Sequence, residues 1–299
     1  MASLKEVKTR IASVKSTRKI TSAMKMVASS KLHRAQQAIE SMRPYELQLA
    51  HIMAAFIAGM EGQVDTPYAL QREVKRVAIV LYTSNSSLCG GFNANVIKVF
   101  NHKVAAYREQ GVEIVRVYPF GKKAADAVRK AGFMVMSDNS SLLDHPAYAP
   151  AAKVAAELMD LYATHQVDHI DMLYHHFKSA GSQVLVEEVF LPINLETDLV
   201  KTSSLQQQAE GTRRWELDYI VEPSKEEVLK SLVPKSLYLK VYTALLDSLA
   251  SEHAARVIAM QVATDNADEL LRELQLTYNK TRQQAITAEL LDIVGGSMQ

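Results

Sequence analysis

The stretch KSLYLKVYTALLDSLASEHAARVIAMQVATDNADELLRELQLTYNKTRQQAITAELLDI, residues 235–293, contains neither glycine nor proline. Because both residues disfavour helix interiors, this stretch predicts one continuous helix. An α-helix rises about 1.5 Å per residue, so the helix would extend for roughly 90 Å, several times the width of a small domain. Such a helix cannot bury its apolar stripe against one globular core, and it needs a partner of similar length.

The other end of the chain supplies that partner. Residues 1–58 contain no glycine and one proline, Pro44, whereas residues 59–211 hold nine of the eleven glycines. Apolar residues recur at helical spacing in both terminal stretches, at Leu4, Val7, Ile11, Val14, Ala28, Leu32, Ala35, Ile39 and Met42, and at Val241, Leu245, Leu249, Leu270, Leu274, Leu290 and Leu291. Such rows are typical of helices wrapped on each other, so we expect an antiparallel coiled coil.

The row in the first stretch is interrupted. Three of its positions are occupied by the polar residues Arg18, Thr21 and Lys25. The apolar residues Ile20, Met24 and Val27 lie on another face of the helix. A fully buried helix would not have polar residues in its apolar row and apolar residues on another face.

The middle of the chain is typical of an α/β domain, because runs of β-branched and aromatic residues alternate with helical stretches. The expected strands are 74–83, 112–120, 133–136, 169–177 and 184–193, and the expected helices are 93–110, 121–131 and 147–165. The last two strands are joined by the short KSAGSQ and could instead form an antiparallel hairpin. We predict a central Rossmann-like domain of about five strands, in a chain of class α/β with a long coiled coil.

The predicted organisation has five parts. They are a first coiled-coil helix over 1–60, a linker over 61–73, the α/β domain over 74–210, a connecting segment over 211–234 and a second coiled-coil helix over 235–299.

Composition narrows the function classes. The longest apolar run, Ile52–Met60, is about half the length that spans a bilayer. The single cysteine, Cys89, excludes an internal disulfide. The net charge is only +1, yet residues 1–58 carry ten Lys and Arg against three Glu. A basic helix could attract nucleic acid, anionic lipid or an acidic protein surface, or be a plain solvated face. Aromatic residues are absent before Tyr45, which weakens a single-strand-binding interpretation.

Two features suggest chemistry, and neither forms a convincing site. The loop TSNSSLCGGFN, residues 83–93, follows a strand, but it matches neither GxGxxG nor a P-loop, so a plain tight turn is favoured over nucleotide binding. No histidine is placed by the sequence to activate Cys89 within it. Four histidines fall close together, at His165, His169, His175 and His176. The last two are adjacent on a strand and face opposite sides, so they cannot share one metal ion.

Five sequence motifs resemble those of a known protein family. They are KITSAMKMVASSKLHRAQ (19–36), SLCGGFN (87–93), YIVEPS (219–224), ASEHAARVIAM (250–260) and ATDNADELLRELQLTYNKTRQQAITAELLDIVGG (263–296). In these motifs and in their order the chain resembles the γ subunit of F-type ATP synthase, in its bacterial form. The first 31 residues also imitate a mitochondrial transit peptide, but the family motif occupies those same residues.

The resemblance implies a rotor shaft inside a hexamer of α and β subunits, with the ε subunit and a membrane ring of c subunits at its foot. It implies a chain that couples proton flow to ATP synthesis or hydrolysis, regulates the ATPase and is itself no enzyme, because the active sites lie on β. No cofactor, metal or nucleic acid is expected, and the place in the cell is the inner face of the plasma membrane, as a peripheral protein.

The resemblance also implies three groups of contact residues. The rotor–stator contacts with β are Met24, Arg282, Gln283 and Thr287. The apolar bearing tip is Leu290, Leu291, Ile293 and Val294. The contacts with ε or the c ring are Arg213, Trp215, Glu216 and Tyr219. Two alternatives from other classes remain, a nucleotide-binding α/β enzyme with a coiled-coil arm and a basic coiled-coil adaptor for nucleic acid or membrane.

Overall fold

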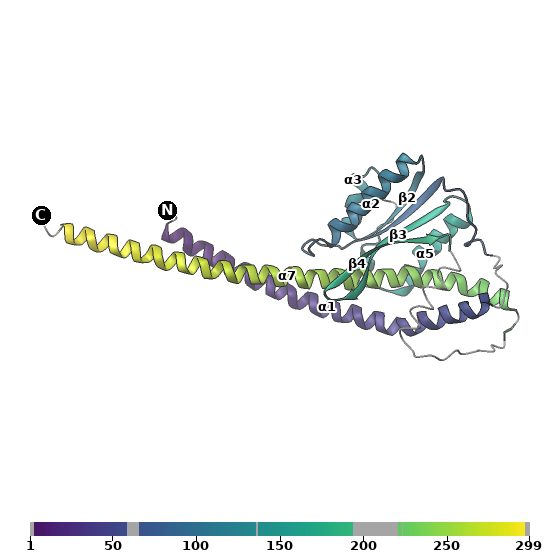
Figure 1. Cartoon of the computed structure of the whole chain (residues 1–299), viewed down its shortest axis with the longest axis horizontal. Coiled ribbons are helices and arrows are strands. Elements are labelled where there is room, and N and C mark those ends of the chain that lie inside the picture. The colour runs from purple at the N-terminus through teal and green to yellow at the C-terminus, as the bar shows by residue number, and fades with distance from the viewer. Residues whose placement is uncertain (1–2, 59–65, 136, 194–220, 223, 297–299) are drawn as a thin grey trace. The chain divides into compact units, whose positions relative to one another are not determined.

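The computed structural model describes residues 3–58, 66–135, 137–193, 221–222 and 224–296. The chain forms two compact units by its internal contacts. The helical unit consists of residues 1–30 and 256–299, and the α/β unit consists of residues 31–255. Helices α1 (Leu4–Ala58) and α7 (Lys225–Gly296) each contribute to both units (Figure 1).

The α/β unit is built on one four-stranded sheet. Its strands are β1 (Arg76–Tyr82), β2 (Glu113–Phe120), β3 (His169–Ser179) and β4 (Ser182–Leu191), in the order β2-β1-β3-β4. Strand β1 is parallel to both β2 and β3, whereas β3 and β4 pair antiparallel. The antiparallel hairpin considered from the sequence is therefore the arrangement that forms. Pro119 lies in β2, an edge strand, where a missing N–H donor is tolerated.

Four helices connect the strands. They are α2 (Phe92–Glu109), α3 (Lys122–Lys130), the short α4 (Ser141–Asp144) and α5 (Tyr148–Ala163). Each of the three longer ones begins and ends within two residues of its predicted bounds.

The strand predicted at residues 133–136 does not form over 133–135, the described part of that stretch. The backbone N–H of Phe133 donates to the carbonyl of Val128 at 3.1 Å and so closes the C-terminal end of α3. That donor is not free to pair with a strand. The side chains of Phe133 and Val135 still pack on a buried cluster, so the apolar pattern of this stretch is satisfied without a fifth strand.

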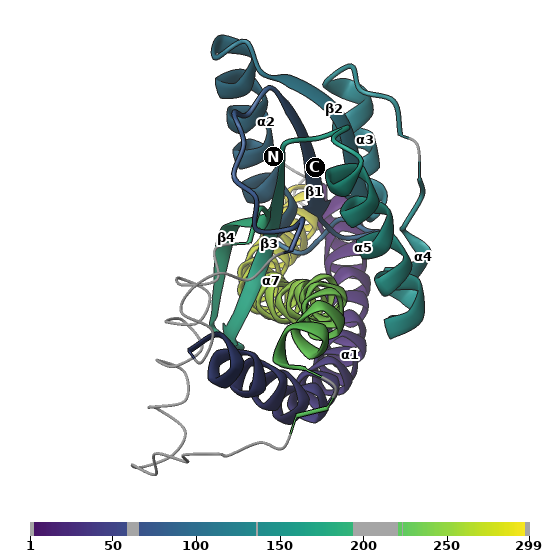
Figure 2. The same ribbon diagram turned by 90° about the vertical axis from the view of Figure 1, so that its right-hand side faces the viewer.

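Two apolar cores cover the two faces of the sheet, because successive strand residues point to opposite faces. Val77 and Ile79 of β1 lie in the core that includes α2 and α3. Ala78 and Val80 lie in the core that includes α5 and the α1 and α7 segments of this unit (Figure 2). Strand β1 is therefore buried on both faces, which explains its continuous apolar sequence.

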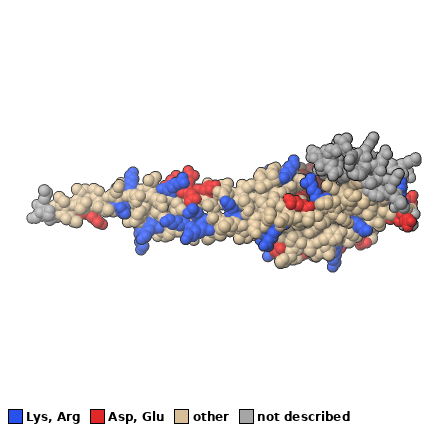
Figure 3. All heavy atoms as spheres, turned by 90° about the horizontal axis from the view of Figure 1, so that it is seen from below, with Lys and Arg blue, Asp and Glu red and all other residues tan. Residues whose placement is uncertain are grey.

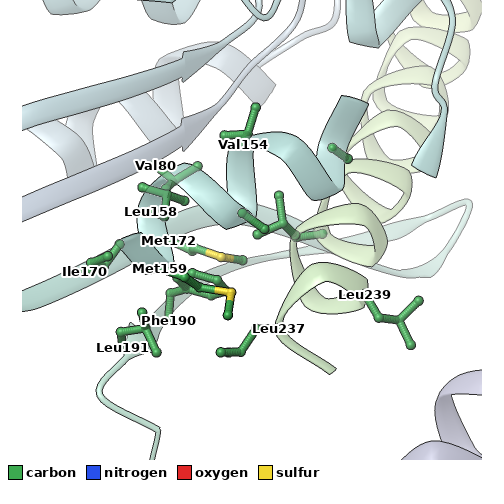
Figure 4. Close-up of a cluster of buried hydrophobic side chains, with 14 of the residues drawn as sticks. Val80, Val154, Leu158, Met159, Ile170, Met172, Phe190, Leu191, Leu237 and Leu239 are labelled. Carbon is green, nitrogen blue, oxygen red and sulfur yellow. The ribbon is translucent and has the colours of Figure 1, made fainter. Parts of the chain in front are cut away.

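Helix α7 begins ten residues before the predicted start at Lys235, so Pro234 lies inside it. A proline inside a helix costs about 3 kcal/mol. Leu229 and Val233, both upstream of the proline, are fully buried in the second core. Each such burial contributes about 1.5–3 kcal/mol, so the two together offset the proline. Figure 4 shows the next residue of this row, Leu237, in the same cluster.

Helix α1 likewise continues through Pro44. Proline lacks the N–H that would donate to the carbonyl of Glu40, so the hydrogen bond expected at that position is absent.

Candidate functional site

The helical unit is an antiparallel pair made by the start of α1 and the end of α7. The hydroxyls of Thr21 and Thr264 lie 2.8 Å apart across the pair. From these two residues, buried or half-buried positions recur along each helix at alternating intervals of three and four residues. They include Val7, Val14, Thr21 and Ala28 on α1 and Met260, Thr264, Ala267, Leu271 and Leu274 on α7. This is the heptad spacing of a coiled coil, and we call these positions the seam.

Three residues of the predicted row on α7, Leu270, Leu290 and Leu291, are exposed and do not lie in the seam. Leu270 is exposed, whereas its neighbour Leu271 is buried. The repeat that runs through Ala267 and Leu274 reaches Leu271, so Leu270 falls on the flank.

The polar interruption of the α1 row has a matching set on α7. The guanidinium of Arg18 lies 2.7 Å from the carboxylate of Asp268. The ammonium of Lys25 donates to the side-chain carbonyl of Gln261. With the Thr21–Thr264 contact, the three polar residues that interrupt the α1 row, Arg18, Thr21 and Lys25, therefore all meet polar partners on α7.

The same region of α1 turns apolar side chains outward. Ile20 is 57% exposed and Val27 is 59% exposed, with half-buried Met24 between them at helical spacing. The sequence shows this second row, but among its members only Met24 was assigned a contact from the resemblance. Ile20 and Val27 are therefore additional candidates, and the signal that identifies them is apolar spacing outside the seam.

The end of α7 extends past the start of α1. Leu4 precedes Thr21 by seventeen residues, and Thr281 follows Thr264 by the same number, so the antiparallel register sets Leu4 opposite Thr281. Helix α7 continues for fifteen more residues, 282–296, or about 22 Å. We call this segment the overhang.

Every described side chain of the overhang is exposed. Its large apolar members are Ile286, Leu290, Leu291, Ile293 and Val294. A concentration of apolar residues on an exposed helix end marks an interaction surface.

The four predicted rotor–stator residues occupy two levels. Arg282, Gln283 and Thr287 lie at the base of the overhang, where the Thr287 hydroxyl donates to the carbonyl of Gln283 at 2.9 Å. Met24 lies near the level of Gln261, which is 21 residues, or about 32 Å, from Arg282 along α7. The structure thus brings three of the four together and places Met24 elsewhere.

Lys and Arg side chains gather along the helical unit on the face seen in Figure 3. The exposed basic residues of α1 in this unit include Lys5, Lys8, Arg10, Lys15 and Lys19. The local excess of positive charge predicted from the sequence is therefore presented to the surroundings. The residues predicted to contact ε or the c ring, Arg213, Trp215, Glu216 and Tyr219, lie outside the described residues.

The loop at 83–93 is occupied by its own hydrogen bonds. The backbone N–H groups that open α3 are those of Lys122 and Ala124, which donate to the side chains of Asn85 and Thr83. The N–H of Lys123 between them donates to a carbonyl of the same loop. These three donors are therefore used within the protein and are not available to a phosphate at the start of α3.

Neither Cys89 nor the four histidines form a reactive group. Cys89 is buried, and its sulfur accepts a hydrogen bond from Asn93. His165 contacts Arg72, His169 contacts Asp171 and His176 contacts Asp247. His175 stacks on Phe92, and burial lowers its pKa to about 4. Within the described residues, no three His, Cys, Asp or Glu side chains could hold a metal ion. None of the described helices is long and apolar enough to cross a bilayer.

Known proteins match the chain over nearly its whole length. The family model for ATP synthase matches residues 3–298. A Bacteroides thetaiotaomicron protein named ATP synthase gamma chain is 54% identical over 301 residues, with 100% of both chains covered. A Flavobacterium johnsoniae protein of the same name is 43% identical over 297 residues, covering 99% of this chain and 98% of that one.

Solved structures share the fold. A chain of the Tetrahymena thermophila mitochondrial ATP synthase central stalk and c-ring superposes with a TM-score of 0.58 at 25% identity, covering 82% of this chain and 99% of that one. A chain of the Euglena gracilis mitochondrial ATP synthase rotor gives a TM-score of 0.58 at 21% identity, with 95% and 98% covered. By the family model and by its relatives, the chain belongs to the ATP synthase gamma chain family.

Proposed function

We propose that this chain is the central rotor shaft of an F-type ATP synthase. In this role the paired helices turn inside the hexamer of α and β subunits, while the α/β unit and the connecting segment meet ε and the c ring. Proton flow drives the rotation during synthesis, and hydrolysis on β drives it in reverse. The chain supplies no catalytic group, and it regulates the ATPase by its angular position.

The observation that carries this proposal is the overhang. A single exposed helix rich in Leu, Ile and Val is costly in water unless another protein surrounds it. Apolar contact is non-directional, so a helix end held this way can rotate without breaking specific bonds. The bearing tip is therefore Leu290, Leu291, Ile293 and Val294.

The base of the overhang is suited to a different contact. Arg282 and Gln283 are exposed and carry directed hydrogen-bond donors. Such donors favour one angular position over others, as a transient latch on a β subunit requires. Met24 makes a second β contact at its own level, flanked by Ile20 and Val27. The basic residues of α1 face acidic lever segments of the β subunits.

The foot of the shaft is assigned from the resemblance. Arg213, Trp215, Glu216 and Tyr219 lie on or beside the surface that meets ε or the c ring, in a connecting segment between the α/β domain and the second coiled-coil helix. Cysteines placed at 213 and 216 in the assembled enzyme should crosslink to ε or c. Products with α or β alone would overturn this assignment. The complex holds the chain at the inner face of the plasma membrane, as a peripheral protein.

Co-expression with α and β subunits tests the proposal as a whole. The full-length chain should co-purify in an assembly with ATPase activity, and a bead on the α/β unit should rotate when ATP is added. A chain ended after Thr281, which lacks the overhang, should keep the helical pair but rotate with reduced torque. Failure of the full-length chain to enter such an assembly would refute the role. ATP binding by the isolated chain, or steeply salt-dependent DNA binding, would favour the two alternatives instead.

A further inference from the structure

Two ion pairs join the β3–β4 hairpin to α7, beside a hydrogen bond from the Ser251 hydroxyl to the carbonyl of His175 at 3.2 Å. The imidazole Nδ1 of His176 lies 2.5 Å from the carboxylate of Asp247. The ammonium of Lys240 lies 3.1 Å from the carboxylate of Glu188 and also donates to the carbonyl of Val189 at 3.3 Å. Both pairs lie in the α/β unit, and neither belongs to the contact surfaces assigned above.

The two pairs are matched in geometry. Asp247 and Lys240 are seven residues apart on α7, which is two turns, so they lie on one face of the helix. On the hairpin, Tyr174 separates His176 from the position that pairs with Glu188, and its hydroxyl donates to Glu188 at 3.0 Å. One face of the hairpin is therefore bound to one face of α7 at two points.

The pairs differ in how they respond to pH. Lys240 and Glu188 belong to residue types that keep their charges near neutral pH, whereas histidine changes its charge there. We propose that His176 and Asp247 form a pH-sensitive latch that fastens the β3–β4 hairpin to α7 in mild acid and releases it as the pH rises. The Lys240–Glu188 pair is the second ion pair of the attachment.

The surroundings of the imidazole set the sign of the effect. The hydrogen bond with Asp247 raises the pKa of His176 above its ordinary value, against the opposing effect of burial. Other charges act from each packed element, with Glu46 of α1 favouring the charged imidazole and Lys178 of β3 opposing it. Asp247 is 16% exposed and His176 is 48% exposed, so solvent partly screens the attraction.

A raised pKa in the docked state means that the stabilisation is complete below about pH 6.5 and disappears as the pH rises through the docked-state pKa. The neighbouring His175 does not confuse the measurement at higher pH. Burial lowers its pKa to about 4, so it is neutral when docked, and an exposed histidine is also mostly neutral above about pH 7.

Hydrogen–deuterium exchange of the full-length chain between about pH 7 and about pH 9 tests the latch, after correction for intrinsic exchange. Protection of residues 175–188 should fall roughly two- to fivefold over this range, while α3 should show no trend. The variant His176→Gln should flatten the profile, and Asp247→Asn should do so as well. The double variant Glu188→Gln, Lys240→Met is the matched control, which should lower protection at every pH but keep the slope.

Each result of the exchange experiment either supports the latch or contradicts it. A flat wild-type profile would overturn the latch. So would a slope that survives in both His176→Gln and Asp247→Asn, because another group would then be responsible. Two single variants guard against one of them failing to fold.

Discussion

The ammonium of Lys103 lies 2.7 Å from the carboxylate of Asp171, and this carboxylate is 1% exposed. The pair joins α2 to the middle of the sheet. Asp171 also contacts His169 at 3.2 Å and accepts a hydrogen bond from the hydroxyl of Tyr107. Burial alone would raise the pKa of Asp171, but these hydrogen bonds outweigh it, and the pKa is lowered.

Replacing Asp171 with Asn should destabilise the α/β unit. The change leaves the Lys103 ammonium without its carboxylate, and breaking a well-buried pair costs about 3–5 kcal/mol. Because Lys103 is still partly exposed, we expect about 2 kcal/mol, measured as a fall in the melting temperature of the full-length chain. The control is Asp126→Asn, which removes an exposed pair with Arg129 and should change little. Equal effects of the two variants would contradict this view.

The lowered pKa of the Asp171 carboxyl predicts that the α/β unit loses stability in acid. The folded pKa of this carboxyl is below the unfolded value, so the stabilisation is present above about pH 4 and is lost as the pH falls through the folded pKa. Unfolding of the wild-type chain should therefore show an acid-dependent loss that Asp171→Asn does not share.

Replacing Arg282 with Ala should reduce ATP synthesis or weaken the assembled complex while leaving the chain folded. Arginine supplies several directed donors that alanine cannot replace. Lys280→Ala is the matched control, because Lys280 is also exposed and lies on the same helix. Unchanged synthesis and unchanged stability of the complex in Arg282→Ala would refute the latch on β.

Replacing Leu290 and Leu291 with Gln should improve the solubility of the isolated chain and impair coupled synthesis in the complex. Both leucines are more than half exposed, so their removal costs no internal packing. Circular dichroism should show the helix content preserved, with Glu289→Gln as the control. Full activity of the double variant would argue against an apolar bearing at these positions.

A double-mutant cycle at Thr21 and Thr264 should reveal their coupling. The Thr21 hydroxyl also reaches the carbonyl of Arg18 at 3.0 Å and the Thr264 hydroxyl that of Met260 at 2.7 Å, and either hydroxyl can donate to the other across the pair. Each Thr→Val change alone should cost about 1 kcal/mol, because it leaves a hydroxyl without its partner. The double change should cost less than the sum, as read from thermal unfolding of the helical signal. Strict additivity would mean that the hydroxyls do not interact.

The sequence predicts the long helices, strands β1 to β4 and the α/β class, because these follow from local spacing and from the absence of helix breakers. It misses the short α4 and predicts a strand at 133–136 that does not form over 133–135. It does not predict which side chains meet. The partners of Arg18 and Lys25 depend on the register between two helices more than 200 residues apart in the chain. The sequence predicts too late a start for α7, because the burial that offsets Pro234 is a tertiary effect. The contact between His176 and Asp247 is also tertiary, so local sequence patterns do not predict it.

The overhang also bears on how the cell must make this protein. Fifteen residues are about the shortest length at which an isolated helix persists in water, so its order depends on continuity with the paired part of α7. A newly synthesised chain would expose this apolar helix end, which associates non-specifically, until the partner subunits cover it. Production of the chain in excess of its assembly partners should therefore lead to aggregation or degradation, and matched synthesis of the subunits becomes a requirement that the fold itself imposes.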